Sequence, residues 1–411
     1  MNKNIAIICI ITVSAVSGQI CYADSVGSFL KHGTYTFQFR PRYEFAQQEG
    51  LRPSHAFTIR TMLGLKTAPV YGLSAYVQFI NVAGIMNKYN SILNGKSSYT
   101  IIPDPEETGV NQFYLQYQMP LNSYIRVGRQ EIVLDDSRFI GNVNFFQTPQ
   151  SYDAISLNYN LNNDIGLYGA YIWRIKNILN QIEPTKSFVI EATVKPIKLI
   201  NINLFGYWYG NQSKSIIPGA PACGLPGIRS CNDQILGARA TGLAKLSNNI
   251  ALKYRVTYAK QLPYDGGSSL VNAHYLHGGA YLKYKSFMLG ADYMLMGSNS
   301  TGTYGFQTPL ATKHLFNGWA DVFLTTPQSG LKSAYFTVKG NIDGLGLMAR
   351  YYNFRSAYKN KAFGHEVDLS VIDKLTHYLN VGAQYADFVT STNVLRNTQA
   401  GWVFCDLKFA G

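Results

Sequence analysis

Apolar and polar residues alternate with a period of two along nearly the whole chain. In the stretch 33–45, aromatic side chains share one face of an extended strand and polar side chains share the other: Tyr35, Phe37, Phe39, Tyr43 and Phe45 against Gln38, Arg40, Arg42 and Glu44. A period of two indicates a β-strand whose faces meet different surroundings, and no helical period is sustained anywhere. The chain is therefore predicted to be all-β.

The alternation recurs about 18 times in stretches of roughly 9–13 residues, the length that a tilted membrane strand needs. The connections between them alternate between short and long, and a soluble sandwich has no reason to sort its loops in this way. We therefore expect a closed antiparallel transmembrane β-barrel of about 18 strands, with short periplasmic turns and long external loops. The expected strands are 33–45, 55–66, 70–80, 109–119, 122–133, 151–160, 165–175, 186–196, 198–209, 234–246, 249–261, 272–284, 286–295, 331–340, 343–355, 364–373, 376–388 and 400–410.

Composition supports a membrane barrel over a set of soluble β domains. Charged residues are only 14% of the chain, and aromatic residues are also 14%, with 30 Tyr and 22 Phe. Soluble β domains would need a second apolar layer over each sheet, and no linker divides the chain. In lipid, closure of the sheet is the way to satisfy every backbone group.

The N-terminus is typical of a secretory signal peptide: Lys3, a short apolar run, then Cys21-Tyr22-Ala23. Cleavage after Ala23 divides the chain into a signal peptide, 1–23, and a barrel domain, 24–411. Cys223 and Cys231 then lie in a Gly/Pro-rich loop, where an exported chain is expected to form a disulfide. The alternative is two unpaired thiols, and a metal site would need further ligands nearby. No metal or cofactor is expected.

Strand parity assigns the polar faces to the lumen and predicts an excess of positive charge there. The net charge is +13, and the basic residues are dispersed, which argues against nucleic-acid binding. Such a wall would favour anions, unless most of the charges pair with each other to hold the wall together. The predicted lumen cations are Arg40, Arg42, Arg60, Lys66, Arg126, Lys195, Arg239, Lys253, Arg255, Lys283, Lys339 and Arg350, against Glu44, Glu191, Asp292, Glu366 and Asp368.

The stretch 122–160 holds two expected strands joined by a connection rich in both signs of charge: Arg129, Glu131, Asp135, Asp136 and Arg138. We expect this connection to fold into or over the pore. Its charges either contact and select the solute or pair with each other and brace the loop. No histidine lies in a nucleophile, metalloprotease or nucleotide motif, so we expect no catalytic residues and no enzyme.

Two patches of sequence resemble the alginate-export family of outer-membrane porins. The first has RVGRQ at 126–130, DDSRFIG at 135–141, QT at 147–148 and SYDA at 151–154, and the second has HLFNGWAD at 314–321. The resemblance implies an 18-stranded barrel with an electropositive constriction. By matching positions it implies that Arg126, Arg129, Asp136, Arg138 and Asp153 lie at or near that constriction. It implies that His314, Trp319 and Asp321 belong to an inward-folded loop.

Three functions fit the sequence. The first is a channel for passive diffusion of small polar, preferentially anionic solutes, and the second is an exporter of an anionic polysaccharide such as alginate. The third is a structural or adhesive barrel whose function lies in the loops 82–108, 210–233 and 296–330. All three place the chain in the outer membrane of a Gram-negative bacterium. The expected partners are outer-membrane lipid, the solute or polysaccharide, and the assembly machinery that reads a terminal strand such as 401–409.

Overall fold

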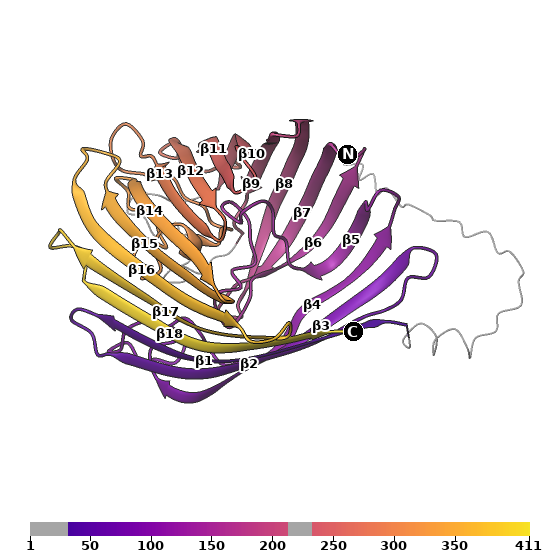
Figure 1. The fold of residues 1–411 in the computed structure, drawn as a ribbon, viewed down its shortest axis with the longest axis horizontal. Helices are drawn as coiled ribbons and strands as arrows, with labels where there is room; N and C mark the ends of the chain where they lie inside the picture. The colour runs from indigo at the N-terminus through magenta and orange to yellow at the C-terminus, as the bar shows by residue number, and fades with distance from the viewer. Residues whose placement is uncertain (1–31, 213–231) are drawn as a thin grey trace, which may run out of the picture.

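The computed structural model describes residues 32–212 and 232–411. Within them the chain forms 18 antiparallel β-strands, and β18 pairs back onto β1, so the sheet closes into a barrel. Figure 1 shows the strands curving around a central space. The strands are β1 (Thr34–Gln48), β2 (Ser54–Lys66), β3 (Leu73–Lys88), β4 (Glu107–Gln118), β5 (Tyr124–Gln130), β6 (Ser151–Asn160), β7 (Ile165–Lys176), β8 (Ile182–Ile197), β9 (Ile200–Tyr209), β10 (Asp233–Lys245), β11 (Ile250–Pro263), β12 (Ala273–Tyr284), β13 (Phe287–Met296), β14 (Leu331–Ile342), β15 (Leu345–Arg355), β16 (Ala362–Lys374), β17 (Leu379–Thr390) and β18 (Thr398–Ala410).

The two faces of each strand differ as the alternation predicts. On β4, Phe113 and Leu115 are 61% and 53% exposed, whereas the intervening Tyr114 is buried. Large apolar side chains on the outer surface of a closed barrel face lipid, and the alternate positions face the lumen. The all-β, 18-stranded barrel expected from the sequence is confirmed. Among the described residues, the single helical segment is a short turn, η1 (Lys313–Leu315), and no helix is long and apolar enough to cross a membrane.

The connections are sorted by length between the two ends of the barrel. At one end they span two to six residues, and at the other end they span five to 34 residues. We call these the short-turn end and the long-loop end. This confirms the predicted alternation of turns and loops, which in outer-membrane barrels lie on the periplasmic and external sides respectively.

Each of the 18 expected stretches contains a strand, but one of them ends early. The alternation predicted a strand to residue 133, whereas β5 stops at Gln130. Glu131 leaves the ladder because its carboxylate accepts hydrogen bonds from Asn111 and Asn142, at 2.7 and 2.6 Å. The expected signal peptide and the expected Cys223–Cys231 disulfide lie outside the described residues.

Two connections of the long-loop end turn inward and occupy the lumen: 131–150, which we call the charged loop, and 297–330, the second inward loop. They meet in an isolated parallel bridge between Ile140 and Leu310. Their aromatic side chains, such as Phe139 and Phe306, join lumen-facing strand residues such as Tyr275 in one buried cluster. The apolar core of this barrel is therefore built around its inward loops.

Candidate functional site

The charged loop reaches two opposite walls of the barrel. In the closed ring of 18 strands, β1 and β10 lie nine strands apart in either direction. The charged loop leaves from β5, yet its side chains bond to β1 and β2 on one side and to β10 and β11 on the other. It therefore crosses the lumen.

Three arginines of β1 and β2 hold the loop mainly by its backbone; we call this side the β1–β2 wall. Arg40 donates to the carbonyls of Asn144 and Phe146, at 3.0 and 2.6 Å, and to Oε1 of Gln147 at 2.9 Å. Arg60 donates to Oδ1 of Asn144 at 2.8 Å. All of these groups are neutral, so the guanidinium charges of Arg40 and Arg60 are not cancelled by their loop partners.

The third of these arginines has carboxylate partners. Arg42 pairs with Glu44 at 3.0 Å and with Asp104, and it also donates to the carbonyl of Phe145 at 2.6 Å. Asp104, in the connection between β3 and β4, accepts a hydrogen bond from the backbone N–H of Gln147 at 2.8 Å. The backbone of the loop thus both donates hydrogen bonds to this side of the barrel and accepts them from it.

The opposite side, which we call the β10–β13 wall, binds the loop through ion pairs. Arg239 lies 2.9 Å from both Asp135 and Asp136, and Arg255 lies 3.0 Å from Asp136. Arg255 also lies 3.3 Å from Asp292, which is shared with His277 at 3.0 Å. Burial raises the pKa of the Asp135 carboxyl above its ordinary value, and Asp136 adds to the rise, while Arg239 opposes it.

From the sequence, one interpretation was that Asp135, Asp136 and Arg138 pair with Arg129 and Glu131 and so brace their own loop. The structure gives them more distant partners. Arg138 is 1% exposed and donates to Oδ1 of Asn317 in the second inward loop, at 3.2 Å. Its guanidinium also lies over the rings of Tyr275 and Phe316. These charges tie the loop to the far wall and to the second inward loop.

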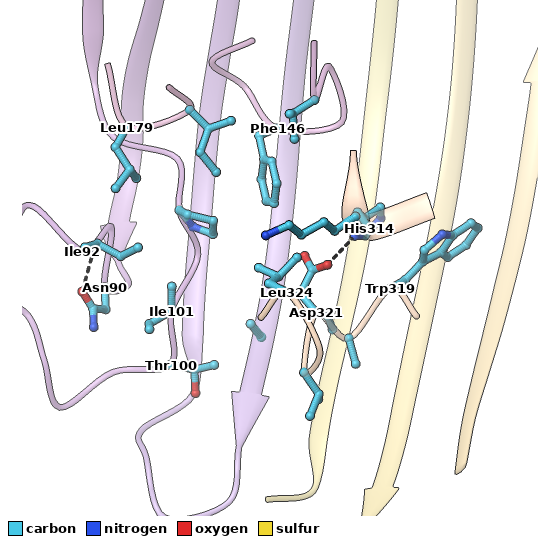
Figure 2. Close-up of a pocket in the computed structure, with 18 of the residues that line it drawn as sticks. Asn90, Ile92, Thr100, Ile101, Phe146, Leu179, His314, Trp319, Asp321 and Leu324 are labelled. Carbon is cyan, nitrogen blue, oxygen red and sulfur yellow. Dashed lines mark hydrogen bonds and ion pairs between the residues drawn. The ribbon is translucent and has the colours of Figure 1, made fainter. Parts of the chain in front are cut away.

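The second inward loop presents His314, Trp319 and Asp321 around a cavity of about 760 Å³ near the long-loop end (Figure 2). Nδ1 of His314 donates to Oδ1 of Asp321 at 3.0 Å. The imidazole is stacked between Phe145 and Trp319, with ring centroids 3.5 and 5.9 Å away. The second inward loop thereby closes against the charged loop.

Lys313 also lines this cavity. Burial, with a smaller contribution from the nearby Arg138 charge, lowers the pKa of its ammonium to about 8. Among the described residues it forms no ion pair with a carboxylate. The cavity thus carries a cation whose charge changes near neutral pH.

The lumen has a different character between the inward loops and the short-turn end. Among the cations that face inward there, Lys408 pairs with Asp406 at 2.7 Å. Seven others are partly or fully exposed, and none of these seven forms an ion pair within the described part of the chain. Arg126 rests over the ring of Tyr114, and Arg350 donates to the hydroxyl of Tyr352 at 2.9 Å. We call the set the lumen cations: Lys66, Arg126, Lys245, Lys253, Lys283, Lys339 and Arg350.

Three residues expected at or near the constriction are placed elsewhere, and one of them, Arg126, lies in the lumen toward the short-turn end. Arg129 of β5 lies opposite Asp153 of β6 and opposite the outward-facing Phe113 of β4. The ion pair of Arg129 and Asp153, at 2.7 Å, lies on the outer surface with Arg174 as a third member. We expected Arg129 and Asp153 to line the constriction, but the structure places them on the outer surface. Arg129 lies two residues from the lipid-facing Val127, and alternation along a strand puts both on the same face.

Sequence reasoning missed several residues that fix the loops. Gln147 belongs to the first of the two family-like patches, but no feature of the sequence predicted that it would bond to Arg40 and Thr58. Asp104 and Thr312 lie in long connections without any pattern, and only the folded structure brings them to the charged loop. Among the described residues, no group of three or more His, Cys, Asp or Glu is arranged to hold a metal ion.

Comparison with known proteins supports this architecture. The family model described as "Alginate export" matches residues 34–258, more than half of the chain. No curated protein sequence matches. The solved structure of Acinetobacter baumannii OccAB2 is similar, with a TM-score of 0.71 at 14% identity over 93% of this chain and 99% of that one. Pseudomonas aeruginosa OccK1 (OpdK) has a TM-score of 0.68 at 11% identity over 93% and 100%, and OccD3 (OpdP) has 0.67 at 12% over 93% and 92%. Identities this low show a shared fold.

Proposed function

This chain belongs to the alginate export family, and from that premise we propose that it forms an outer-membrane channel for passive diffusion of small polar solutes, with a preference for anions. The inward loops narrow the water path near the long-loop end. The lumen cations then set the potential along the rest of it.

The observation that carries the anion preference is the absence of carboxylate partners for the lumen cations in the part of the chain that the structure describes. Four arginines of the two walls are buried against the charged loop, and the fifth, Arg255, is only 21% exposed, so they shape the path and contribute less to contact with the solute. The lumen cations are exposed to water and lie at several depths on seven different strands, from β2 to β15. Several weak sites in series let an anion enter and leave, as conduction requires.

The test is the reversal potential of the purified protein in a planar bilayer under a KCl gradient. We expect the wild type to pass chloride in preference to potassium. Lys253→Gln/Lys283→Gln/Lys339→Gln should lower the chloride-to-potassium permeability ratio by roughly two- to fivefold, because three focused charges are removed from the wall. A cation preference in the wild type would overturn the proposal.

A matched control removes the same charge from the outer surface. Lys88, Lys186 and Lys260 have the parity of lipid-facing residues on β3, β8 and β11. Lys88→Gln/Lys186→Gln/Lys260→Gln should leave the permeability ratio within experimental error of the wild type. If both triple variants shift the ratio equally, net charge and not the lumen sets the preference.

The family match favours export of an anionic polymer as a second candidate. Oligouronates that block the current, with no block by neutral oligosaccharides of the same size, would favour polymer passage. Equal or absent block by both would favour small solutes. If the protein inserts but gives no current at any voltage, both channel functions fail, and a structural or adhesive barrel is left.

A further inference from the structure

The outer surface of the barrel carries very different charges at its two ends. Near the long-loop end, cations occupy outward positions on seven strands, and the outward carboxylates among the described residues are Asp153 and Asp387. Near the short-turn end, the outward strand positions hold one carboxylate, Asp373, and no cation. We call the cationic set the rim row: Lys88, Arg129, Arg174, Lys186, Lys260, Lys332 and Arg355.

Register fixes the orientation of the rim row. Lys186 continues the outward series of Phe188 and Ile190 along β8, and both of those residues are more than 40% exposed. Lys332 has the parity of Ala334 and Phe336, and it pairs with Arg355 of the next strand. In each case the cation lies near the strand end that adjoins a connection of the long-loop end.

The rim row is densest on the four consecutive strands β5 to β8, where Arg129, Asp153, Arg174 and Lys186 form what we call the rim patch. Asp153 accepts a hydrogen bond from Nε of Arg129 at 2.7 Å, and its Oδ2 forms an ion pair with Nε of Arg174 at 2.9 Å. One carboxylate therefore serves two guanidiniums, and the Arg174 side chain stays 52% exposed. A β-bulge between Ile172 and Arg174 turns this arginine outward. Lys186 has no carboxylate partner within the described ranges.

The depth of the row in the membrane follows from the cost of charge in lipid. An Arg or Lys on the lipid face costs about 2–4 kcal/mol at the bilayer midplane and about 0–1 kcal/mol near the interface. Trp173 and Trp208 lie beside the rim patch, and tryptophan is typical of the membrane–water interface. The rim row therefore lies at the level of the lipid headgroups.

We propose that the rim row, centred on the rim patch, binds the phosphorylated headgroups of the lipids in the leaflet at the long-loop end. Seven cations against two carboxylates give this belt a positive charge that complements phosphate, and a guanidinium can donate two parallel hydrogen bonds to it. The ligand is a lipid surface and not a transported solute, because every member of the row faces away from the lumen. The proposal goes beyond conduction and is independent of it.

The test measures binding of lipid A with two phosphates to the full-length barrel in an uncharged detergent, as lipid retained through gel filtration. Arg174→Gln/Lys186→Gln is the informative variant, because Asp153 keeps its bidentate partner Arg129 and the wall stays intact. We expect its apparent Kd to rise about 25-fold, roughly fivefold for each cation removed. Lipid A with one phosphate should bind the wild type more weakly, and inorganic phosphate at the same concentration should not compete.

The matched control is Lys283→Gln/Lys339→Gln, which removes the same charge from the lumen. It should leave the Kd for lipid A within twofold of the wild type, although it alters ion selectivity. Arg174→Gln/Lys186→Gln should do the reverse, with lipid binding weakened and selectivity retained. Equal lipid binding by both variants and the wild type would overturn the proposal. Competition by inorganic phosphate would also overturn it, since the row would then be a general anion site.

Discussion

The β1–β2 wall and the β10–β13 wall grip the same loop by different chemistry. The first wall offers Arg40 and Arg60 to carbonyl and amide oxygens, whereas the second offers Arg239 and Arg255 to carboxylates. A hydrogen bond to a carbonyl leaves the charge of the arginine in place, but an ion pair cancels it. The two sides of one constriction thus make opposite use of the same side chain.

The difference leaves a field across the lumen. Formally, the β1–β2 wall combines three arginines with Glu44 and Asp104. The β10–β13 wall and its part of the loop combine Arg239, Arg255 and Arg138 with three carboxylates, Asp135, Asp136 and Asp292. The first side has an excess of positive charge, whereas the charges of the second side balance. In a low-dielectric wall such a difference is felt by any charged or dipolar solute that passes between them.

The largest effect should come from removing an ion-pair member of the β10–β13 wall. Arg239→Gln leaves Asp135 and Asp136 in a buried site with less compensation, so we expect docking of the loop to weaken by about 3–5 kcal/mol. Single-channel conductance would rise and fluctuate as the loop leaves its place. Adding Asp135→Asn should restore much of the loss, and a double-mutant cycle with zero coupling would contradict the pairing.

A smaller loss is expected on the β1–β2 wall. Arg40→Met leaves the carbonyls of Asn144 and Phe146 without their donor, which should cost about 2–3 kcal/mol in loop docking. The loop should become cleavable by added protease while the barrel remains heat-stable. Unlike Arg239→Gln, this variant should gain nothing from a neighbouring Asp→Asn change, because no carboxylate is left unpaired.

Arg60 should matter least among these arginines. Its Nε and Nη2 have no partner among the described protein groups, although the side chain is fully buried. Arg60→Met therefore trades an incompletely bonded charge for an apolar chain of similar length, and we expect a change of about 1 kcal/mol or less. Equilibrium unfolding in urea measures it. A loss as large as that of Arg40→Met would mean that the few hydrogen bonds of Arg60 to the loop contribute as much as the four of Arg40, which include one to the carbonyl of Phe145.

Lys313 should have the smallest effect on stability and ion selectivity, and the effect should be seen as a dependence on pH. Its pKa of about 8 lies below the value of about 10.4 for an unfolded lysine, so the unfolded chain binds this proton more tightly. The free energy of unfolding should rise between pH ~8 and ~10.4 from this group. The charge itself is present below pH 8 and lost above it, so anion preference should decline slightly as pH rises through 8. Lys313→Gln should show the same reversal potential at pH 7 and pH 9.

Local alternation was enough to predict every strand, because each barrel strand meets lipid on one face and water or loop on the other. The same parity placed Arg40, Arg42, Arg60, Arg239, Arg255 and Arg350 on the inner face, where the structure has them. Arg129 was expected at the constriction from its motif, although three residues separate it from Arg126 and put it on the opposite face. Parity was the better guide there.

What the sequence could not supply is which residues meet across the lumen. Arg239 and Asp135 are 104 positions apart, and their contact depends on where the ring closes and how far the loop reaches. The rim row was missed for another reason. Its members are single charges at the ends of separate strands, so they form no cluster until closure places the strand ends on one circumference.

The double grip on the charged loop also has a consequence for the order of assembly. The seam between β1 and β18 joins the first and last strands of the barrel, so the β1–β2 wall takes its place opposite the β10–β13 wall in a closed ring only after the last strand has paired. Contacts of such long range form late in folding. Docking of the charged loop onto both walls must therefore follow ring closure. A newly inserted barrel would pass through a wide, leaky stage before its own loop seals it.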